Sequence, residues 1–207
     1  MLFRSKKEET FIDKRKRTKS RKDLFFESPQ RITIMGDFFK KDYENFSRHH
    51  YLKGKPKVMY MAYNIEVAHR LFKELQKDPH YQNKACLIVS KQHHYQSSEL
   101  INAIGKEKEN IRSFKDPQSD LNIAIVVDKL TTGFNMENLE RIYLDQQITA
   151  PHNFFQKISR VNRKYSGKSQ GFVVDLVGNQ KTYEKVLIEY FNDKSSGEYD
   201  GGKIENL

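Results

Sequence analysis

Short apolar runs alternate with segments of helical periodicity along most of this chain, and this alternation restricts the possible folds more than any other feature. Runs typical of buried strands occupy residues 57–63, 84–89, 123–127, 141–144 and 171–175. Segments with apolar residues at helical spacing occupy residues 35–46, 64–76, 97–114, 154–165 and 180–191. Strands and helices in alternation form βαβ units, whose crossovers are right-handed. The sequence therefore predicts an α/β fold in which helices flank a parallel sheet.

Two of the predicted helices carry clear apolar faces. In segment 64–76, Asn64 is well placed to cap the amino terminus, and the inner face consists of Ile65, Ala68, Leu71, Phe72 and Leu75. Segment 97–114 is expected to form one helix, with apolar residues Leu100, Ile101, Ile104, Ile111 and Phe114. We expect both faces to pack on the sheet.

The predicted helix at 154–165 combines an apolar face with a stripe of arginine. On an α-helix, Gln156, Arg160 and Arg163 share one side. The opposite side carries Phe154, Ile158, Val161 and Tyr165. We expect the apolar side to pack and the arginine side to meet an anionic ligand. A solvated amphipathic helix with no ligand is the alternative.

The residues before this helix favour the ligand interpretation. The apolar run 123–127 leads into a loop that contains Thr131, Thr132 and Gly133. Ligands of open α/β sheets bind at the carboxyl ends of strands. The loop and the arginine helix together predict a nucleotide site.

Four segments also resemble motifs of a known family. The stretches IVVDKLTTGFN, RIYLDQQ, HNFFQKISRVNR and GFVVDLVG resemble motifs V and VI of superfamily 2 helicases, in the form found in the motor (R) subunit of type I restriction enzymes. The upstream stretch KPKVMYMAYNIEVAHRLFKEL is similar to motif IV, so the resemblance covers roughly residues 31–191. The chain departs from the family at Asn135, where an aspartate is common, and at Ser159, where alanine or glycine is usual.

The resemblance implies a fold and an activity. The fold would be a three-layer RecA-like parallel sheet without a phosphate loop of its own, the second of two motor lobes. ATP and Mg²⁺ would be bound mainly by a first lobe absent from this chain. The parent enzyme would translocate duplex DNA by hydrolysing ATP and then cleave it as an ATP-dependent, site-specific deoxyribonuclease.

The resemblance also implies roles for individual residues. Arg163 would be an arginine finger on the γ-phosphate, Arg160 its partner on the phosphates, and Gln156 a bridge between nucleotide and finger. Gly133 would let the backbone approach the nucleotide, and Asn135 would lie beside the ribose or the interlobe cleft, although its departure from aspartate weakens the ribose role. The expected contacts with the DNA backbone are Thr131, Thr132, Ser90 and Lys91.

Motifs absent from the sequence agree with a second lobe. The chain has no G-x-x-x-x-G-K-S/T phosphate loop, no DEAD-like acidic box and no nuclease core, so we expect the isolated chain to be inactive. The histidine pairs His49-His50 and His93-His94 are not accompanied by carboxylate or thiolate ligands. We therefore expect surface histidines and no metal site.

Charge is concentrated at the amino terminus. Residues 1–22 hold ten Lys or Arg against three acids, whereas the whole chain has a formal net charge of +10. Such an arm can neutralise phosphates, and it can equally be a solvated tail. We divide the chain into a basic arm or linker (1–30), the RecA-like lobe (31–191) and a carboxyl-terminal tail or linker (192–207).

The sequence also indicates the cellular location and the binding partners of the protein. The chain has no membrane-spanning apolar run and no secretory signal, and its single Cys86 lies in an apolar run where a buried, unreactive thiol is expected. We expect a prokaryotic cytoplasmic protein. The expected partners are double-stranded DNA, a first RecA-like lobe and a nuclease domain of the same parent chain, and the specificity and methyltransferase subunits. The alternatives are the equivalent lobe of another superfamily 2 protein, such as a remodeller or repair helicase, and a non-enzymatic basic DNA-binding module.

Overall fold

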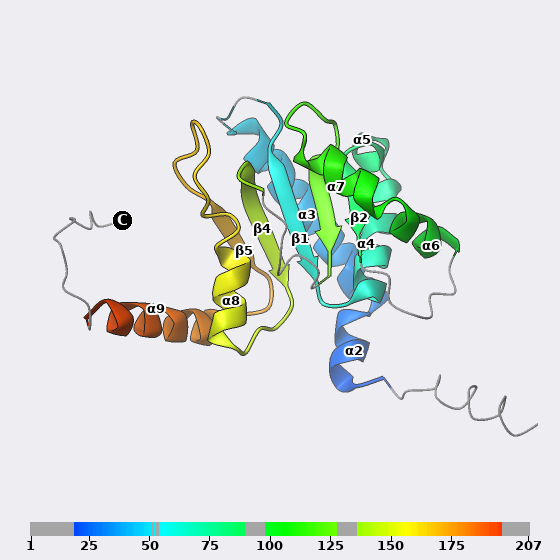
Figure 1. The fold of residues 1–207 in the computed structure, drawn as a ribbon. Coiled ribbons are helices and arrows are strands. Elements are labelled where there is room, and N and C mark those ends of the chain that lie inside the picture. The colour runs from blue at the N-terminus through cyan, green and yellow to red at the C-terminus, as the bar shows by residue number, and fades with distance from the viewer. Residues whose placement is uncertain (1–18, 51, 53, 90–97, 128–135, 196–207) are drawn as a thin grey trace, which may run out of the picture.

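The structure, a computed structural model, describes residues 19–50, 52, 54–89, 98–127 and 136–195. Within these residues, strands and helices alternate as the hydrophobic pattern predicts (Figure 1). The strands are β1 (Lys57–Ala62), β2 (Ala85–Ile88), β3 (Ile123–Val126), β4 (Leu139–Asp145) and β5 (Phe172–Asp175). The helices are α2 (Arg21–Phe26), α3 (Pro29–Arg48), α4 (Ile65–Gln76), α5 (Pro79–Gln82), α6 (Ser98–Gly105), α7 (Glu107–Lys115), α8 (Pro151–Ile158) and α9 (Gln180–Ser195).

The strands form one parallel sheet in the order β2-β3-β1-β4-β5. In the central strand β1, Tyr60 lies opposite Ile125 of β3 and Tyr143 of β4. Every residue of β1 is buried, because helices cover both faces of the sheet. A strand buried on both faces reads as a continuous apolar run, which is why the sequence alone located it.

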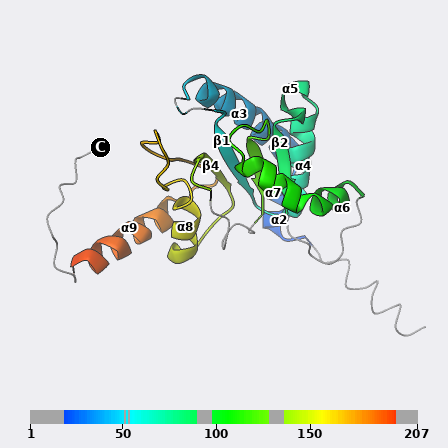
Figure 2. The same ribbon diagram turned by 45° about the horizontal axis from the view of Figure 1, so that its top comes forward.

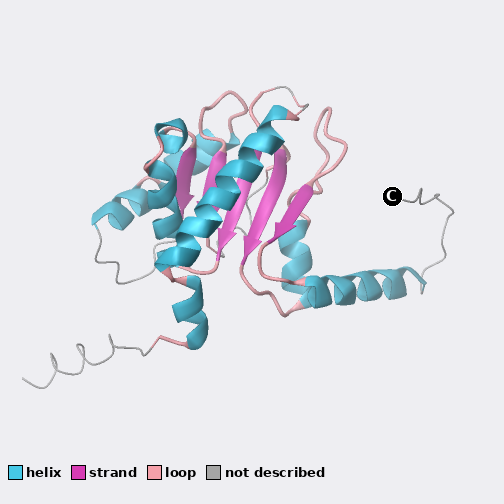
Figure 3. Cartoon of the chain, turned by 180° about the vertical axis from the view of Figure 1, so that it is seen from behind, coloured by secondary structure: helices cyan, strands magenta, loops and turns pink. Residues whose placement is uncertain are grey.

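One face of the sheet is covered by α3 and α4. Figure 3 shows the long helix α3 lying across this face. Its aromatic side chains pack with α4 on alternate residues of the strands; the fully buried members include Phe39, Tyr60, Leu71, Leu75 and Tyr143. The rings of Phe39 and Tyr143 meet edge to face, with centroids 4.8 Å apart.

The opposite face is covered by α7 and α8 (Figure 2), and α9 runs from α8 away from the sheet (Figures 1 and 3). The core here combines strand residues such as Met59 and Ile142 with Phe114, Phe154 and Val186 from the helices. Two helical layers around a parallel sheet are the three-layer RecA-like architecture that the resemblance implies, and the predicted fold class is confirmed.

A buried ion pair connects the carboxyl end of β4 to α2 and α3. Asp145 is fully buried. It accepts a hydrogen bond of 2.8 Å from the hydroxyl of Tyr60 and two from the guanidinium of Arg31 on α3. The guanidinium of Arg31 also lies 4.5 Å from the ring centre of Phe26 on α2. Part of segment 1–30 therefore packs on the lobe, while the proposed boundaries at residues 30 and 191 stay predictions.

Segment 97–114 forms two helices, so the prediction of one continuous helix is wrong. α6 ends at Gly105, a residue of low helix propensity, and Lys106 at the start of α7 has φ −90° and ψ 7°. The side-chain amide of Asn110 donates to the carbonyl of Leu87 in β2 at 3.2 Å. This tertiary hydrogen bond holds α7 on the sheet independently of α6.

Two other local predictions are confirmed. The side-chain oxygen of Asn64 caps α4 by accepting the N–H of Val67 at 2.9 Å. Cys86 is buried in β2, and burial raises the pKa of its thiol to about 12. A thiol with so high a pKa stays protonated and unreactive near neutral pH.

Candidate functional site

The arginine-bearing segment is helical over a shorter range than its sequence predicts. Beyond Ile158 the backbone turns more tightly, and the N–H of Val161 bonds the carbonyl of Ile158 three residues back at 3.2 Å. The hydroxyl of Ser159 donates to the carbonyl of Gln156 at 3.1 Å, which competes with the helical bonding pattern. The predicted stripe on a single α-helix is therefore wrong, because both arginines lie beyond its end.

Arg160 and Arg163 nevertheless lie close together on the turn that follows α8. Arg160 is 6% exposed, whereas Arg163 is exposed. Burial, together with the charge of Arg163, lowers the pKa of the Arg160 guanidinium. The alternative of a fully solvated arginine stripe therefore does not describe Arg160. Two neighbouring cations, one of them buried, favour the binding of an anion at this turn.

Gln156 lies on α8 itself and is half-buried. Its amide nitrogen is 2.7 Å from Nε2 of His152, one turn earlier on the same helix. Its predicted role between nucleotide and finger stays a prediction.

The turn that carries the arginines rests on the backbone of Gly171, just before β5. A Cβ atom at Gly171 would lie 2.2 Å from the carbonyl oxygen of Val161 and 2.6 Å from its Cβ. No larger residue fits without moving the turn. Sequence reasoning missed Gly171, although a glycine at the start of a strand-like run can signal a close backbone approach.

Lys168 connects the same turn to the start of β4. Its Nζ donates hydrogen bonds to the carbonyl oxygens of Leu139 at 2.6 Å, Glu137 at 3.2 Å and Arg163 at 3.2 Å. Leu139 is the first residue of β4, so Arg163 lies at the amino-terminal edge of the sheet. Ligands of open α/β sheets bind at the opposite, carboxyl-terminal edge, so that rule does not account for the position of Arg163.

A buried acid–histidine pair lies at the same edge. Burial raises the pKa of the Glu140 carboxyl, and its Oε2 lies 2.8 Å from Nδ1 of His50. Nε2 of His50 lies 3.1 Å from the carbonyl oxygen of Gly54. The prediction of a surface histidine is wrong for His50, while His93 and His94 lie outside the described residues.

Lys57, at the start of β1, is a further buried charge at this edge. Its side chain is almost fully buried at 1% exposure, and its Nζ donates to the carbonyl of Leu121 at 2.8 Å. Burial lowers its pKa to about 8. A lysine in this setting loses its proton more readily than one in water.

Six predicted site residues lie outside the described residues: Ser90, Lys91, Thr131, Thr132, Gly133 and Asn135. The strands before them are placed, and Ile88 of β2 lies beside Val126 of β3. Both strands end at the carboxyl-terminal edge of the sheet. Glu137, two residues after segment 128–135, contacts Lys168 at the amino-terminal edge. The described residues on the two sides of that segment therefore lie at opposite edges of the sheet.

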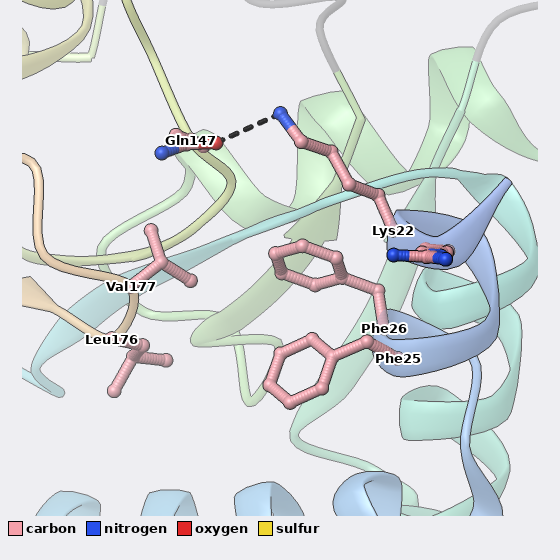
Figure 4. A pocket seen from close by; sticks show the side chains of 7 residues that line it. Lys22, Phe25, Phe26, Gln147, Leu176 and Val177 are labelled. Atoms are coloured by element: carbon pink, nitrogen blue, oxygen red, sulfur yellow. Dashed lines mark hydrogen bonds between the residues drawn. The ribbon is translucent and has the colours of Figure 1, made fainter.

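A cavity of about 490 Å³ opens at the carboxyl-terminal edge (Figure 4). It lies between α2 and the loops after β4 and β5 and is lined by Arg21, Lys22, Phe25, Phe26, Gln147, Leu176 and Val177. Nζ of Lys22 donates to Oε1 of Gln147 at 2.9 Å, across 125 residues of sequence. Arg21 and Lys22 belong to the predicted basic arm, and no local signal in the sequence could have paired Lys22 with Gln147.

The described residues contain no group of three or more His, Cys, Asp or Glu side chains that could hold a metal ion. No helix among them has both the length and the apolar character needed to cross a membrane.

Comparisons with known proteins identify the family. The family model described as type I restriction enzyme subunit R domain 3 matches residues 33–177. A putative type I restriction enzyme MjaIXP endonuclease subunit from Methanocaldococcus jannaschii is 33% identical over 140 residues, which are 66% of this chain and 13% of the relative. The type I restriction enzyme HindI endonuclease subunit from Haemophilus influenzae is 37% identical over 97 residues, 45% of this chain and 9% of the relative.

The chain thus spans a small part of the length of these relatives. A solved structure, the C-terminal domain of the DEAD-box protein Dbp5, is similar with a TM-score of 0.46 at 14% identity, covering 73% of this chain and 78% of that one. Because the family model covers well over half of the sequence, the chain belongs to the family of type I restriction enzyme subunit R domain 3.

Proposed function

We propose that this chain is the second motor lobe of an ATP-dependent DNA translocase in the R subunit of a type I restriction enzyme, and that Arg163 is its arginine finger. The observation that carries the proposal is the pair formed by buried Arg160 and exposed Arg163 on one turn, in a domain of the R-subunit family. Two cations so close together favour a polyanion such as a triphosphate.

The residues of this turn fit the phosphates of ATP. Arginine stays charged and presents planar, forked donors that match phosphate oxygens. Arg163 would neutralise the negative charge that develops on the γ-phosphate, Arg160 would hold a neighbouring phosphate, and Gln156 would contact both nucleotide and finger. Because the sequence has no phosphate loop, ATP and Mg²⁺ would be held mainly by a first lobe of the same parent chain.

The opposite edge of the sheet would face DNA. Ser90, Lys91, Thr131 and Thr132 follow strands that end at the carboxyl-terminal edge, and hydroxyl and ammonium groups can hold backbone phosphates without reading sequence. Segment 128–135, which includes the predicted nucleotide contacts Gly133 and Asn135, follows β3, and Glu137 beyond it lies at the edge of Arg163. We expect this segment to connect the state of the bound nucleotide with the contacts to DNA.

The parent protein would contain more than this lobe. Its first motor lobe and nuclease domain would lie in the same chain, and the specificity and methyltransferase subunits would direct it to a site. Sequence recognition would then belong to another subunit, as a motor that tracks along duplex DNA requires.

The test is DNA-stimulated ATP hydrolysis by the full-length R subunit, assembled with its specificity and methyltransferase subunits. Arg163→Ala should lower kcat on the order of 10³- to 10⁵-fold, while binding of a non-hydrolysable ATP analogue persists. Arg163→Lys should also lower kcat, because an ammonium lacks the planar, forked donors of a guanidinium. The matched control is Lys164→Ala, which removes an exposed charge from the next residue.

A wild-type rate with Arg163→Ala would overturn the proposal. The non-enzymatic DNA-binding module would then be the better account, and deletion of residues 1–22 should abolish binding to duplex DNA.

A further inference from the structure

We propose that Lys168 is a positioning residue that holds Arg163 in place for catalysis by joining the backbone of its turn to the backbone that enters β4. This inference rests on the proposed function, because it concerns the same nucleotide site. Lys168 lies between the motif stretches HNFFQKISRVNR and GFVVDLVG and belongs to neither.

The first support is the hydrogen-bond geometry of the Lys168 ammonium. Its three N–H donors match three carbonyl acceptors, on Leu139 at 2.6 Å and on Glu137 and Arg163 at 3.2 Å each. These carbonyls belong to two segments of the chain. A single ammonium thus joins the backbone of the arginine turn to the backbone that enters β4.

The second support is the environment of this ammonium. Burial lowers the pKa of Lys168, and the nearby charge of Glu140 opposes that effect. Most surface lysines keep their charge in water, whereas Lys168 is half-buried and bonds main-chain oxygens. Three carbonyl dipoles converge on one position there, and a cation between them offsets their mutual repulsion.

The third support is the exposure of Arg163. Its side chain is exposed, so core packing does not determine where it points. The position of its backbone must be set by the turn, and the Lys168 hydrogen bond acts directly on the Arg163 carbonyl. A finger must be held to within about an ångström, since a misplacement of roughly 1 Å can lower a rate about 100-fold.

The experiment measures kcat and KM for DNA-stimulated ATP hydrolysis in the assembled full-length enzyme. Lys168→Met, which keeps the aliphatic length and removes all three donors, should lower kcat about 100-fold, as expected for an arginine finger misplaced by about 1 Å. Lys164→Met is the matched control and should leave kcat unchanged. Lys168→Arg keeps a charge but not the compact ammonium, and should give an intermediate kcat.

A double variant distinguishes positioning from general stabilisation. If Lys168 acts through Arg163, then Lys168→Met should cause no further loss in the Arg163→Ala background. A loss of the same factor in both backgrounds, or a wild-type kcat for Lys168→Met, would overturn the inference. If the enzyme with Lys168→Met does not assemble, Lys168→Arg is measured in its place. A wild-type kcat for Lys168→Arg would then refute the positioning role.

The two proposals fail separately. A wild-type rate for Arg163→Ala refutes the finger itself and, with it, any positioning by Lys168. A strong loss for Arg163→Ala combined with a wild-type rate for Lys168→Met refutes the positioning role alone.

Discussion

Replacing Gly171 by alanine is the sharpest test of how the fold supports the arginine turn. The new methyl carbon would lie 2.2 Å from the carbonyl oxygen of Val161, whereas contacts under 3.0 Å essentially never occur for real Cβ atoms. The turn must therefore retreat from β5 by about 1 Å, which can lower the rate of a reaction about 100-fold. Overpacking of this kind also lowers the free energy of unfolding by about 1–3 kcal/mol.

The assay is again DNA-stimulated ATP hydrolysis by the assembled full-length enzyme, together with thermal unfolding. We expect Gly171→Ala to reduce kcat about 100-fold while the protein remains folded. Gly105→Ala is the matched control, because a Cβ there meets nothing within 4 Å. A wild-type kcat for Gly171→Ala in a folded protein would refute the reasoning that this glycine sets the position of Arg163.

The remaining predictions concern the stability of the lobe. Burial lowers the pKa of Lys57 from 10.5 to about 8, so between these values the unfolded chain binds more protons than the folded one, and the free energy of unfolding rises with pH. In urea denaturation, the free energy of unfolding of the wild type should rise by roughly 3 kcal/mol from pH 7 to 11 relative to that of Lys57→Met. A difference between the two proteins that stays constant with pH would contradict the lowered pKa. Arg31→Met leaves the carboxylate of Asp145 buried without its guanidinium partner and should cost about 3–5 kcal/mol of unfolding free energy. The double variant Arg31→Met with Asp145→Asn should recover part of that loss in the same denaturation assay, and strictly additive losses would argue against a coupled pair.

Local patterns predicted most of the secondary structure. The run at Lys57–Ala62 is apolar throughout because both faces of that strand are covered, so its composition alone reports its burial. Asn64 caps α4 through a hydrogen bond that spans three residues. Such features depend on neighbours in the sequence, and sequence periodicity therefore locates them.

The helix ends were less predictable. A period of 3.6 residues continues through Gly105 and through Ser159, yet helices end or break at both positions. At Ser159 the decisive contact is local, the hydroxyl bond to Gln156, but the path beyond it follows the close approach of Val161 to Gly171. That approach joins two segments on different elements, and no pattern within either segment encodes it.

Sequence patterns predicted the five strands in chain order, the parallel sheet and the kinds of side chain available for anion binding, including Arg160 and Arg163. Only contacts between remote segments bury Arg160, place Arg163 at the amino-terminal edge and bring Lys168 to its backbone. The physical reason is the range of the interactions. Propensity and periodicity act over a few residues, whereas burial and the convergence of distant carbonyls on one ammonium arise only when remote segments of the chain are brought together.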